Sequence, residues 1–178
     1  MTVKTMFATL YFPNVYLQAA LRHQPELRSQ PVVLLDGVEA KAVIIQLNKA
    51  AQQFGIRSGM TPSQALARCL SLVVKVRERP QEQQLATIIL QFASTLSPYV
   101  EETAAGICTV EFTDNRSLEA KLMRAIDQLA ELGLIASAGI AQTPDTSLLA
   151  AHLARPVLQV GDARSFLASL PIETLSAM

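Results

Sequence analysis

The sequence predicts an α+β protein: a ferredoxin-like split βαβ sheet that carries a small mixed α/β insertion. Half of the 178 residues are hydrophobic and only 17% are charged, which is typical of a folded chain with a sizeable core. Apolar runs of strand length alternate with segments of helical periodicity. When residues 31–79 are set aside as an insertion, the order of elements is β-α-β-β-α-β, which is the ferredoxin-like arrangement.

The first elements follow from apolar runs and their breakers. Residues 6–12 form a continuous apolar run that predicts a buried strand, and Pro13 ends it. Residues 15–21 have the spacing of a short helix. The polar stretch 24–29 is expected to be a loop, and the branched side chains of 31–36 predict a second strand.

The insertion carries the clearest capping signals. Residues 42–46 are expected to pair with the preceding strand as a hairpin. Asn48 is placed to cap a helix that ends at Gly55. The sequence TPSQ at 61–64 is a capping box with proline at the first helical position, and it predicts a helix to about residue 69. Residues 72–76 then predict a strand.

The last hundred residues complete the predicted sheet. A long amphipathic helix, a pair of strands, a second helix that stops at Gly133, a strand of small residues and two further helices follow in turn. Their expected ranges are 80–95, 98–103, 106–112, 118–132, 134–140, 143–155 and 164–170, with a strand end at 159–160.

Composition limits the function. The formal net charge is zero, which argues against a strong general nucleic-acid binder but leaves room for a local basic patch. Two cysteines, Cys69 and Cys108, lie in apolar runs and are expected to be buried thiols in a reducing cytoplasm. The first residues lack the pattern of a signal peptide, and no apolar run is long enough to cross a bilayer.

The usual catalytic patterns are missing from the sequence. There is no phosphate loop or dinucleotide glycine motif, and neither His23 nor His152 has a metal-ligand neighbour at useful spacing. Cys108 occupies a packing position in a strand and is not expected to be a nucleophile. Glu101 and Glu102 are adjacent, so in a strand they point to opposite faces and cannot hold one metal together.

Four segments, in order and at consistent spacing, resemble the N-terminal region of the Y family of translesion DNA polymerases, the UmuC/DinB-like proteins. They cover nearly the whole chain. The FGIRSGM stretch before the capped helix is the most specific of them. The segments read MFATLYFPNVYLQAAL from residue 6, LNKAAQQFGIRSGMTPSQALARC from 47, SPYVEETAAGICTVEFTD from 97 and SAGIAQTPDTSLLAAHLARP from 137.

The resemblance implies a palm of residues 1–30 and 80–163, a fingers region of 31–79, and the beginning of a thumb at 164–178. Active members of the family hold two divalent ions with three carboxylates. In this sequence Tyr11, Gly106 and Ile107 fall at those positions. A phenol, a hydrogen and an aliphatic group are not ligands for magnesium, which requires oxygen donors such as carboxylates. The resemblance therefore implies no catalytic residue, no metal site and no cofactor.

The positions that contact nucleotide in the family are altered as well. Lys49 and Gln52 fall where a tyrosine and an arginine grip the triphosphate, and Leu148 falls near a palm lysine. Tyr16 matches the aromatic residue that screens the sugar, although packing of this helix residue on the fingers is the preferred explanation. The residues expected to contact nucleotide or DNA are Tyr16, Lys49, Gln52, Arg57, Arg68 and Arg155.

This pattern is similar to the ImuB-like branch of the family, which keeps the polymerase fold and lacks the catalytic acids. The resemblance implies an adaptor in DNA repair, the SOS response, translesion synthesis and damage-induced mutagenesis. Its expected partners are primer–template DNA, bound weakly, and a replicative-type polymerase, a sliding clamp and an accessory mutagenesis protein, all bound through regions beyond this chain.

Two alternatives stay open from the sequence. One is an active translesion polymerase with relocated metal ligands, for which Glu101, Glu102, Glu111 and Asp114 would have to converge. Glu111 lies four residues beyond Ile107, about 13 Å along a strand, so it cannot replace the missing pair. The other alternative is a ferredoxin-like regulatory module that binds a small molecule or another subunit.

Overall fold

The computed structural model describes residues 5–39, 41–113 and 116–171. The chain divides into two compact units, residues 1–12 with 90–178 (unit 1) and residues 13–89 (unit 2). The predicted insertion 31–79 lies within unit 2. The predicted thumb start falls partly on residues 172–178, outside the described residues. Among the described helices, none is both long and apolar enough to span a membrane.

Unit 1 contains a five-stranded sheet in the order β5-β6-β1-β7-β8. Each neighbouring pair is antiparallel except β7 and β8. Without β8, this is the strand order of a ferredoxin-like split βαβ sheet, as predicted. The strands are β1 (Met6–Tyr11), β5 (Val100–Ala104), β6 (Ile107–Phe112), β7 (Ser137–Ala141) and β8 (Val157–Gln159).

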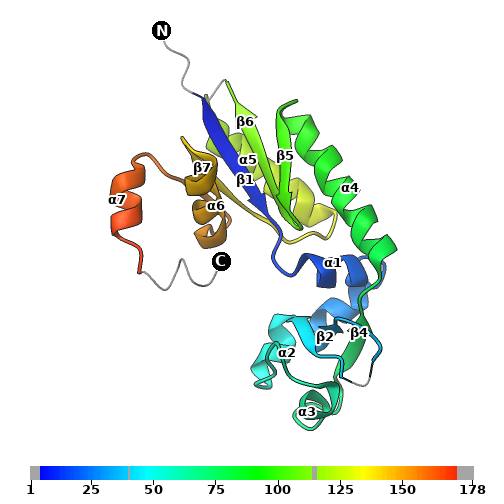
Figure 1. Ribbon diagram of the computed structural model, residues 1–178. Coiled ribbons are helices and arrows are strands. Elements are labelled where there is room, and N and C mark those ends of the chain that lie inside the picture. The colour runs from blue at the N-terminus through cyan, green and yellow to red at the C-terminus, as the bar shows by residue number, and fades with distance from the viewer. Residues whose placement is uncertain (1–4, 40, 114–115, 172–178) are drawn as a thin grey trace. The chain divides into compact units, whose positions relative to one another are not determined.

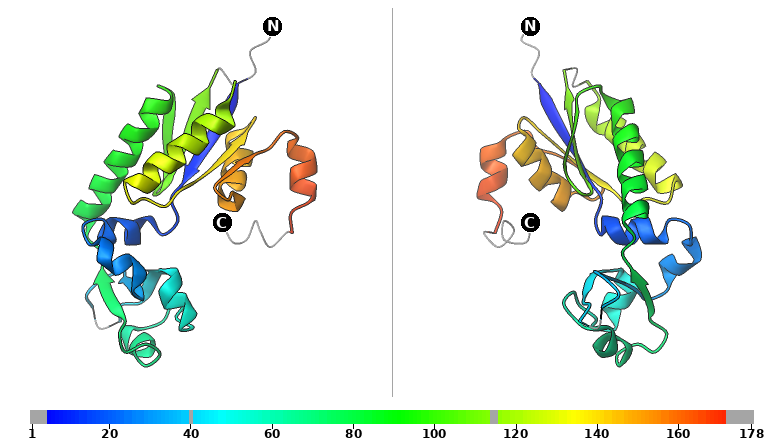
Figure 2. Two further views of the ribbon diagram at one scale, coloured as in Figure 1. Left: turned by 180° about the vertical axis from the view of Figure 1, so that it is seen from behind. Right: turned by 45° about the vertical axis from the view of Figure 1, so that its right-hand side comes forward.

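Helices cover this sheet on both faces (Figures 1 and 2), with α5 (Leu118–Glu131) on one face and α6 (Pro144–Leu153) on the other. Successive side chains of β1 point to opposite faces of the sheet, which allows helices to pack on both faces. Ala8 and Leu10 are fully buried on one face, while Thr9 contacts α6 on the other. Lys121 of α5 donates to the Leu96 carbonyl at the end of α4 (Arg79–Leu96), at 2.6 Å. The short helix α7 (Ala163–Ala168) follows β8.

Unit 2 contains a three-stranded sheet in the order β3-β2-β4, with β2 antiparallel to β3 and parallel to β4. The predicted capping box forms: the Thr61 hydroxyl accepts from the Gln64 amide and the Gln64 side chain accepts from the Thr61 amide. Its elements are α1 (Val15–Leu21), η1 (Pro25–Ser29), β2 (Val32–Leu35), β3 (Ile44–Leu47), α2 (Lys49–Gln53), α3 (Pro62–Leu66) and β4 (Val73–Val76).

Asn48 organises this unit beyond capping α2. Its side-chain oxygen accepts from the amides of Ala51, at 3.0 Å, and Val32, at 3.1 Å. Its side-chain nitrogen donates to the Gln30 carbonyl at 2.6 Å. One side chain therefore caps α2 and also holds the beginning of β2 beside it.

Three sequence-based expectations are wrong in detail. Residues 24–29 are not a loop, because Pro25–Ser29 forms a 3₁₀ helix with proline at its start. The strand predicted from residue 134 begins at Ser137, after Gly133 has turned the chain at a φ of 74°. The helix predicted from 61 to 69 ends at Leu66.

Candidate functional site

The three positions that the resemblance aligns with the family's carboxylates, Tyr11, Gly106 and Ile107, lie together in unit 1. In the antiparallel pairing of β1 and β6, Tyr11 is directly opposite Ile107. The Phe12 amide donates to the Gly106 carbonyl at 2.8 Å, which fixes the end of β1 against the turn between β5 and β6. Gly106 has a φ of 74°, a conformation that favours glycine over a residue with a side chain.

Tyr11 is covered by an aromatic partner that the sequence did not predict. Its ring stacks on His152 of α6, with ring centroids 3.9 Å apart and planes tilted by 34°. Burial raises the pKa of the Tyr11 phenol and lowers the pKa of the His152 imidazole. Both shifts favour the neutral forms at pH 7, so an uncharged aromatic pair occupies this position.

Hydroxyl groups continue the site along β1. The fully buried hydroxyls of Thr9 and Ser147 are 2.6 Å apart, and Thr109 on β6 lies 3.1 Å from Thr9. The Ser147 hydroxyl donates to the Pro144 carbonyl at 2.7 Å, which leaves the Thr9 hydroxyl to donate to Ser147 or Thr109. The site therefore presents phenol, imidazole and hydroxyl groups where a two-metal site would need anionic oxygens.

The residues at this position do not fit a pair of magnesium ions. Neither Ile107 nor Gly106 has a donor atom in its side chain, and the Tyr11 phenol stays protonated. Within the ranges that the structure describes, no group of three or more His, Cys, Asp or Glu side chains could hold a metal ion. No step of nucleotidyl transfer follows from this site.

Of the carboxylates named as relocated ligands, Glu101, Glu102 and Glu111 do not all lie on one face of the sheet. Glu101 is opposite Thr109, whereas Glu102 is opposite Cys108 on the other face of the sheet, as their adjacency predicted. Only Glu101 and Glu111 share a face, and Asp114 lies outside the described residues. The Glu102 carboxylate is near enough to add to the effect of burial in raising the pKa of the Cys108 thiol to about 11.

Both cysteines are free and buried, as predicted. A thiol with a pKa of about 11 is protonated at neutral pH, so Cys108 is a packing residue and not an activated nucleophile.

Tyr16 of unit 2 lies against a cation. The Arg77 guanidinium is 3.9 Å from the centroid of the Tyr16 ring. Glu82 holds Arg77 through two bonds of 2.7 Å, and this hydrogen bonding raises the pKa of the guanidinium. The sequence offered no local signal for the contact between Tyr16 and Arg77, because 61 positions separate the two residues (77 − 16).

The other predicted contact residues are exposed. Lys49 and Gln52 lie on α2, and Arg57 follows it. Arg68 donates to the Gly55 carbonyl at 2.5 Å, so part of its hydrogen-bonding capacity is used within unit 2. Arg155 belongs to unit 1, where it donates to the Ala154 carbonyl at 2.6 Å. Their roles toward nucleotide or DNA stay predictions.

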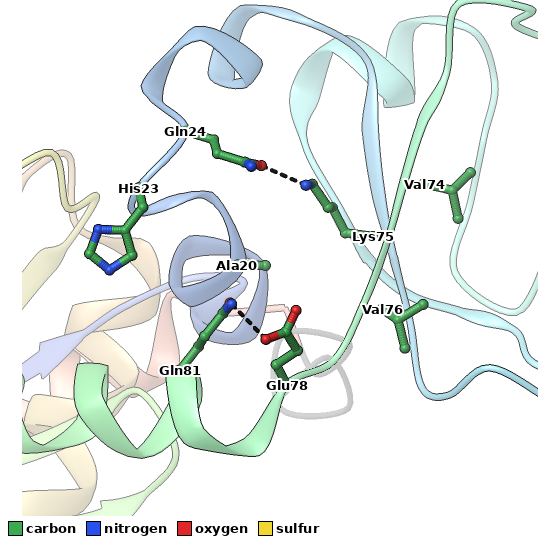
Figure 3. Close-up of a pocket in the computed structure, with 8 residues that line it drawn as sticks. All are labelled: Ala20, His23, Gln24, Val74, Lys75, Val76, Glu78 and Gln81. Atoms are coloured by element: carbon green, nitrogen blue, oxygen red, sulfur yellow. Dashed lines mark hydrogen bonds between the residues drawn. The ribbon is translucent and has the colours of Figure 1, made fainter.

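A hollow of about 380 Å³ lies within unit 2, between α1, β4 and the beginning of α4. Figure 3 shows four of its polar side chains in two hydrogen-bonded pairs. Lys75 donates to Gln24 at 2.5 Å and Gln81 donates to Glu78 at 2.8 Å. Because these groups satisfy each other, we assign no ligand to this hollow.

The Tyr11–His152 stack predicts a pH dependence of stability. The folded state lowers the pKa of His152 below its ordinary value of 6.5, so this residue contributes stability above that pH and loses it as the pH falls. We expect the free energy of unfolding to decrease more between pH 7.5 and pH 5 in the parent chain than in His152→Phe, which keeps a ring but cannot be protonated. Urea unfolding at both pH values measures this, and equal decreases would contradict it.

Comparison with known proteins identifies the family. Residues 10–152 match the sequence profile of the impB/mucB/samB family. The DNA polymerase IV of Ralstonia nicotianae is 26% identical over 169 residues, which are 90% of this chain and 47% of that protein. The DNA polymerase IV of Shewanella halifaxensis is 30% identical over 172 residues, which are 88% of this chain and 46% of that protein. The chain thus spans about half the length of these relatives.

Solved structures agree on the fold. A post-insertion binary complex of Dbh DNA polymerase superposes with a TM-score of 0.85 at 14% identity, over 95% of this chain and 52% of that one. DinB from Sulfolobus solfataricus superposes with a TM-score of 0.82, also at 14% identity and over the same shares. The profile match over residues 10–152, most of the chain, shows that the chain belongs to the impB/mucB/samB family.

Proposed function

We propose that this chain is the non-catalytic, polymerase-like part of an adaptor in DNA repair, translesion synthesis and damage-induced mutagenesis. The observation that supports it most is the pairing of Tyr11 with Ile107 at the end of β1. The family's chemistry needs carboxylates there, and this chain instead has a phenol stacked on an imidazole and an aliphatic side chain.

Charge explains why these residues do not hold two metal ions. Two divalent cations close together repel each other strongly, and anionic ligands must offset that repulsion. Tyr11 and His152 have pKa shifts that keep both groups neutral at pH 7. A neutral site does not offset the repulsion between two cations. The simplest function for this chain is therefore one that uses the polymerase fold without nucleotidyl transfer.

An adaptor of this kind acts by contact. We place the chain in the cytoplasm, in weak contact with primer–template DNA through local basic side chains, because a net charge of zero provides no general attraction to phosphate. A replicative-type polymerase, a sliding clamp and an accessory mutagenesis protein are the proposed partners. Regions of a longer protein beyond this chain would bind them.

A primer-extension assay tests the proposal. We expect no extension of a primer–template by the protein with magnesium or manganese, under conditions in which the DNA polymerase IV of Shewanella halifaxensis extends it. Extension that is lost in Glu101→Gln or Glu111→Gln would overturn the proposal in favour of relocated ligands.

A manganese titration tests the site in the 178-residue chain itself. The unmodified 178-residue chain should bind no Mn²⁺ that is detected by electron paramagnetic resonance at micromolar protein. Because Tyr11 and Ile107 are cross-strand partners, the double variant Tyr11→Asp/Ile107→Glu should gain weak binding. Binding by the parent chain that equals binding by the variant would contradict the proposed site.

A further inference from the structure

A second hollow, of about 250 Å³, lies on the sheet of unit 1 and includes neither Tyr11 nor His152 in its lining. Its floor comes from β5, β6 and β1, which are adjacent in the sheet (Figure 1), and the first residue of α6 borders it. The lining includes two aromatic side chains, Phe7 and Tyr99, and two acidic side chains, Glu101 and Glu111.

The strand register brings two carboxylates onto this surface. Glu101 is the cross-strand partner of Thr109, and Glu111 lies two residues farther along β6 on the same face. The two glutamates are therefore diagonal neighbours, about 7–8 Å apart at their Cα atoms. Two side chains of this length at that separation can reach one cationic group between them.

Neither carboxylate is neutralised within the described part of the chain, where no hydrogen bond or ion pair reaches the side-chain oxygens of Glu101 or Glu111. The Tyr99 side chain beside them is 61% exposed, and its carbonyl accepts from the Glu111 amide at 2.9 Å, which holds it at the edge of the hollow. An exposed aromatic ring next to two unpaired anions attracts a planar cation.

We propose that this hollow binds an arginine side chain of a partner protein. A guanidinium can stack on Tyr99 while its fork of N–H groups donates to Glu101 and Glu111. A lysine ammonium has the same charge but no planar group that could stack on the Tyr99 ring. A nucleic acid would bring phosphates toward the two carboxylates and would be repelled. The charge and shape of the hollow therefore favour a protein ligand on this face.

Binding of arginine in this hollow requires only the geometry of β5, β6 and β1 and does not depend on the proposed function. Arginine binding is measured without any catalytic readout. If the chain were not an adaptor, arginine binding could still be found, and if arginine did not bind, the adaptor proposal would still stand.

Nuclear magnetic resonance titration of the 178-residue chain with an acetylated, amidated Gly-Arg-Gly peptide tests the proposal. We expect the backbone amide signals of Tyr99, Glu101, Thr109 and Glu111 to shift in a saturable manner. The double variant Glu101→Gln/Glu111→Gln should bind at least about tenfold more weakly, because it loses both charge-assisted hydrogen bonds. Both side chains reach solvent, so the variant should keep its fold, and the unchanged remainder of its spectrum verifies this.

Three controls make the result decisive. Glu102→Gln removes the same charge from the other face of β5 and should leave the affinity unchanged. The matching lysine peptide should bind more weakly than the arginine peptide. Absence of saturable shifts, equal binding of the lysine peptide, equal binding by the double variant, or shifts of these residues by an oligothymidylate in place of the peptide would each overturn the proposal.

Discussion

Replacing Gly139 by alanine should lower the free energy of unfolding by at least about 3 kcal/mol. A Cβ atom at this position would lie 2.7 Å from the carbonyl carbon of Ala150 and closer still to the Ser147 carbonyl oxygen and the Ala151 amide nitrogen. These are backbone atoms of α6, which cannot move aside as a flexible side chain would. Thermal and urea unfolding measure the loss.

The same substitution should disturb the candidate site. Gly139 lets the backbone of α6 approach β7 closely, and that approach holds His152 over Tyr11 and Ser147 against Thr9. If α6 is pushed outward, we expect the Tyr11–His152 contact to loosen. The pH dependence of unfolding that comes from His152 should then become weaker in Gly139→Ala than in the parent chain.

Gly161→Ala is the matched control, because it lies in the same unit and no atom is within 4 Å of the position of an added Cβ. Its free energy of unfolding should change by no more than about 0.5 kcal/mol. If Gly139→Ala were as stable as Gly161→Ala, the close packing of α6 on β7 described above would be incorrect.

The fold was largely predictable because its signals are local. The TPSQ capping box, the Asn48 cap and the apolar runs of β1 and β2 each act within a few residues, and the structure confirms all of them. β8 was only partly predicted, because a strand of three residues is too short to show alternation. Its pairing with β7 depends on tertiary contacts that no local pattern encodes.

The candidate site likewise has features that the sequence predicted and features that it did not. The family resemblance predicted that Tyr11 and Ile107 belong to one site. The pairing of β1 with β6 brings the two residues together. The contact of His152 with Tyr11 was not predicted, because it depends on how closely α6 packs at Gly139. The contact between Arg77 and Tyr16 likewise depends on the folding of unit 2.

The proposed weak contact with DNA requires local basic charges, because the net charge of the chain is zero. In unit 1, the face of the sheet beside α6 has a neutral site and the acidic hollow of Glu101 and Glu111, neither of which attracts phosphate. In unit 2, Lys49 and Arg57 are exposed near α2. We therefore expect local cations, and not the palm sheet, to supply the affinity for DNA.

Reversing four of these charges should weaken binding to a primer–template at least about a hundredfold at 50 mM salt. The variant carries Lys49→Glu, Arg57→Glu, Arg68→Glu and Arg155→Glu. Each phosphate contact that is lost should also reduce the slope of log affinity against log salt by about 0.9, so up to about 3.6 for all four. Fluorescence anisotropy of a labelled primer–template at several salt concentrations measures both quantities.

A second quadruple variant separates local contact from net charge. Lys41→Glu, Arg79→Glu, Arg124→Glu and Arg164→Glu reverse four other exposed cations and change the net charge equally. Because 0.1 M salt screens surface charges beyond about 10 Å, at that salt concentration this variant should keep most of the affinity, and it should keep nearly all of the salt slope. Equal losses in the two variants would mean that DNA responds only to the total charge. An unchanged affinity in the first variant would mean that the DNA contacts lie elsewhere on the protein.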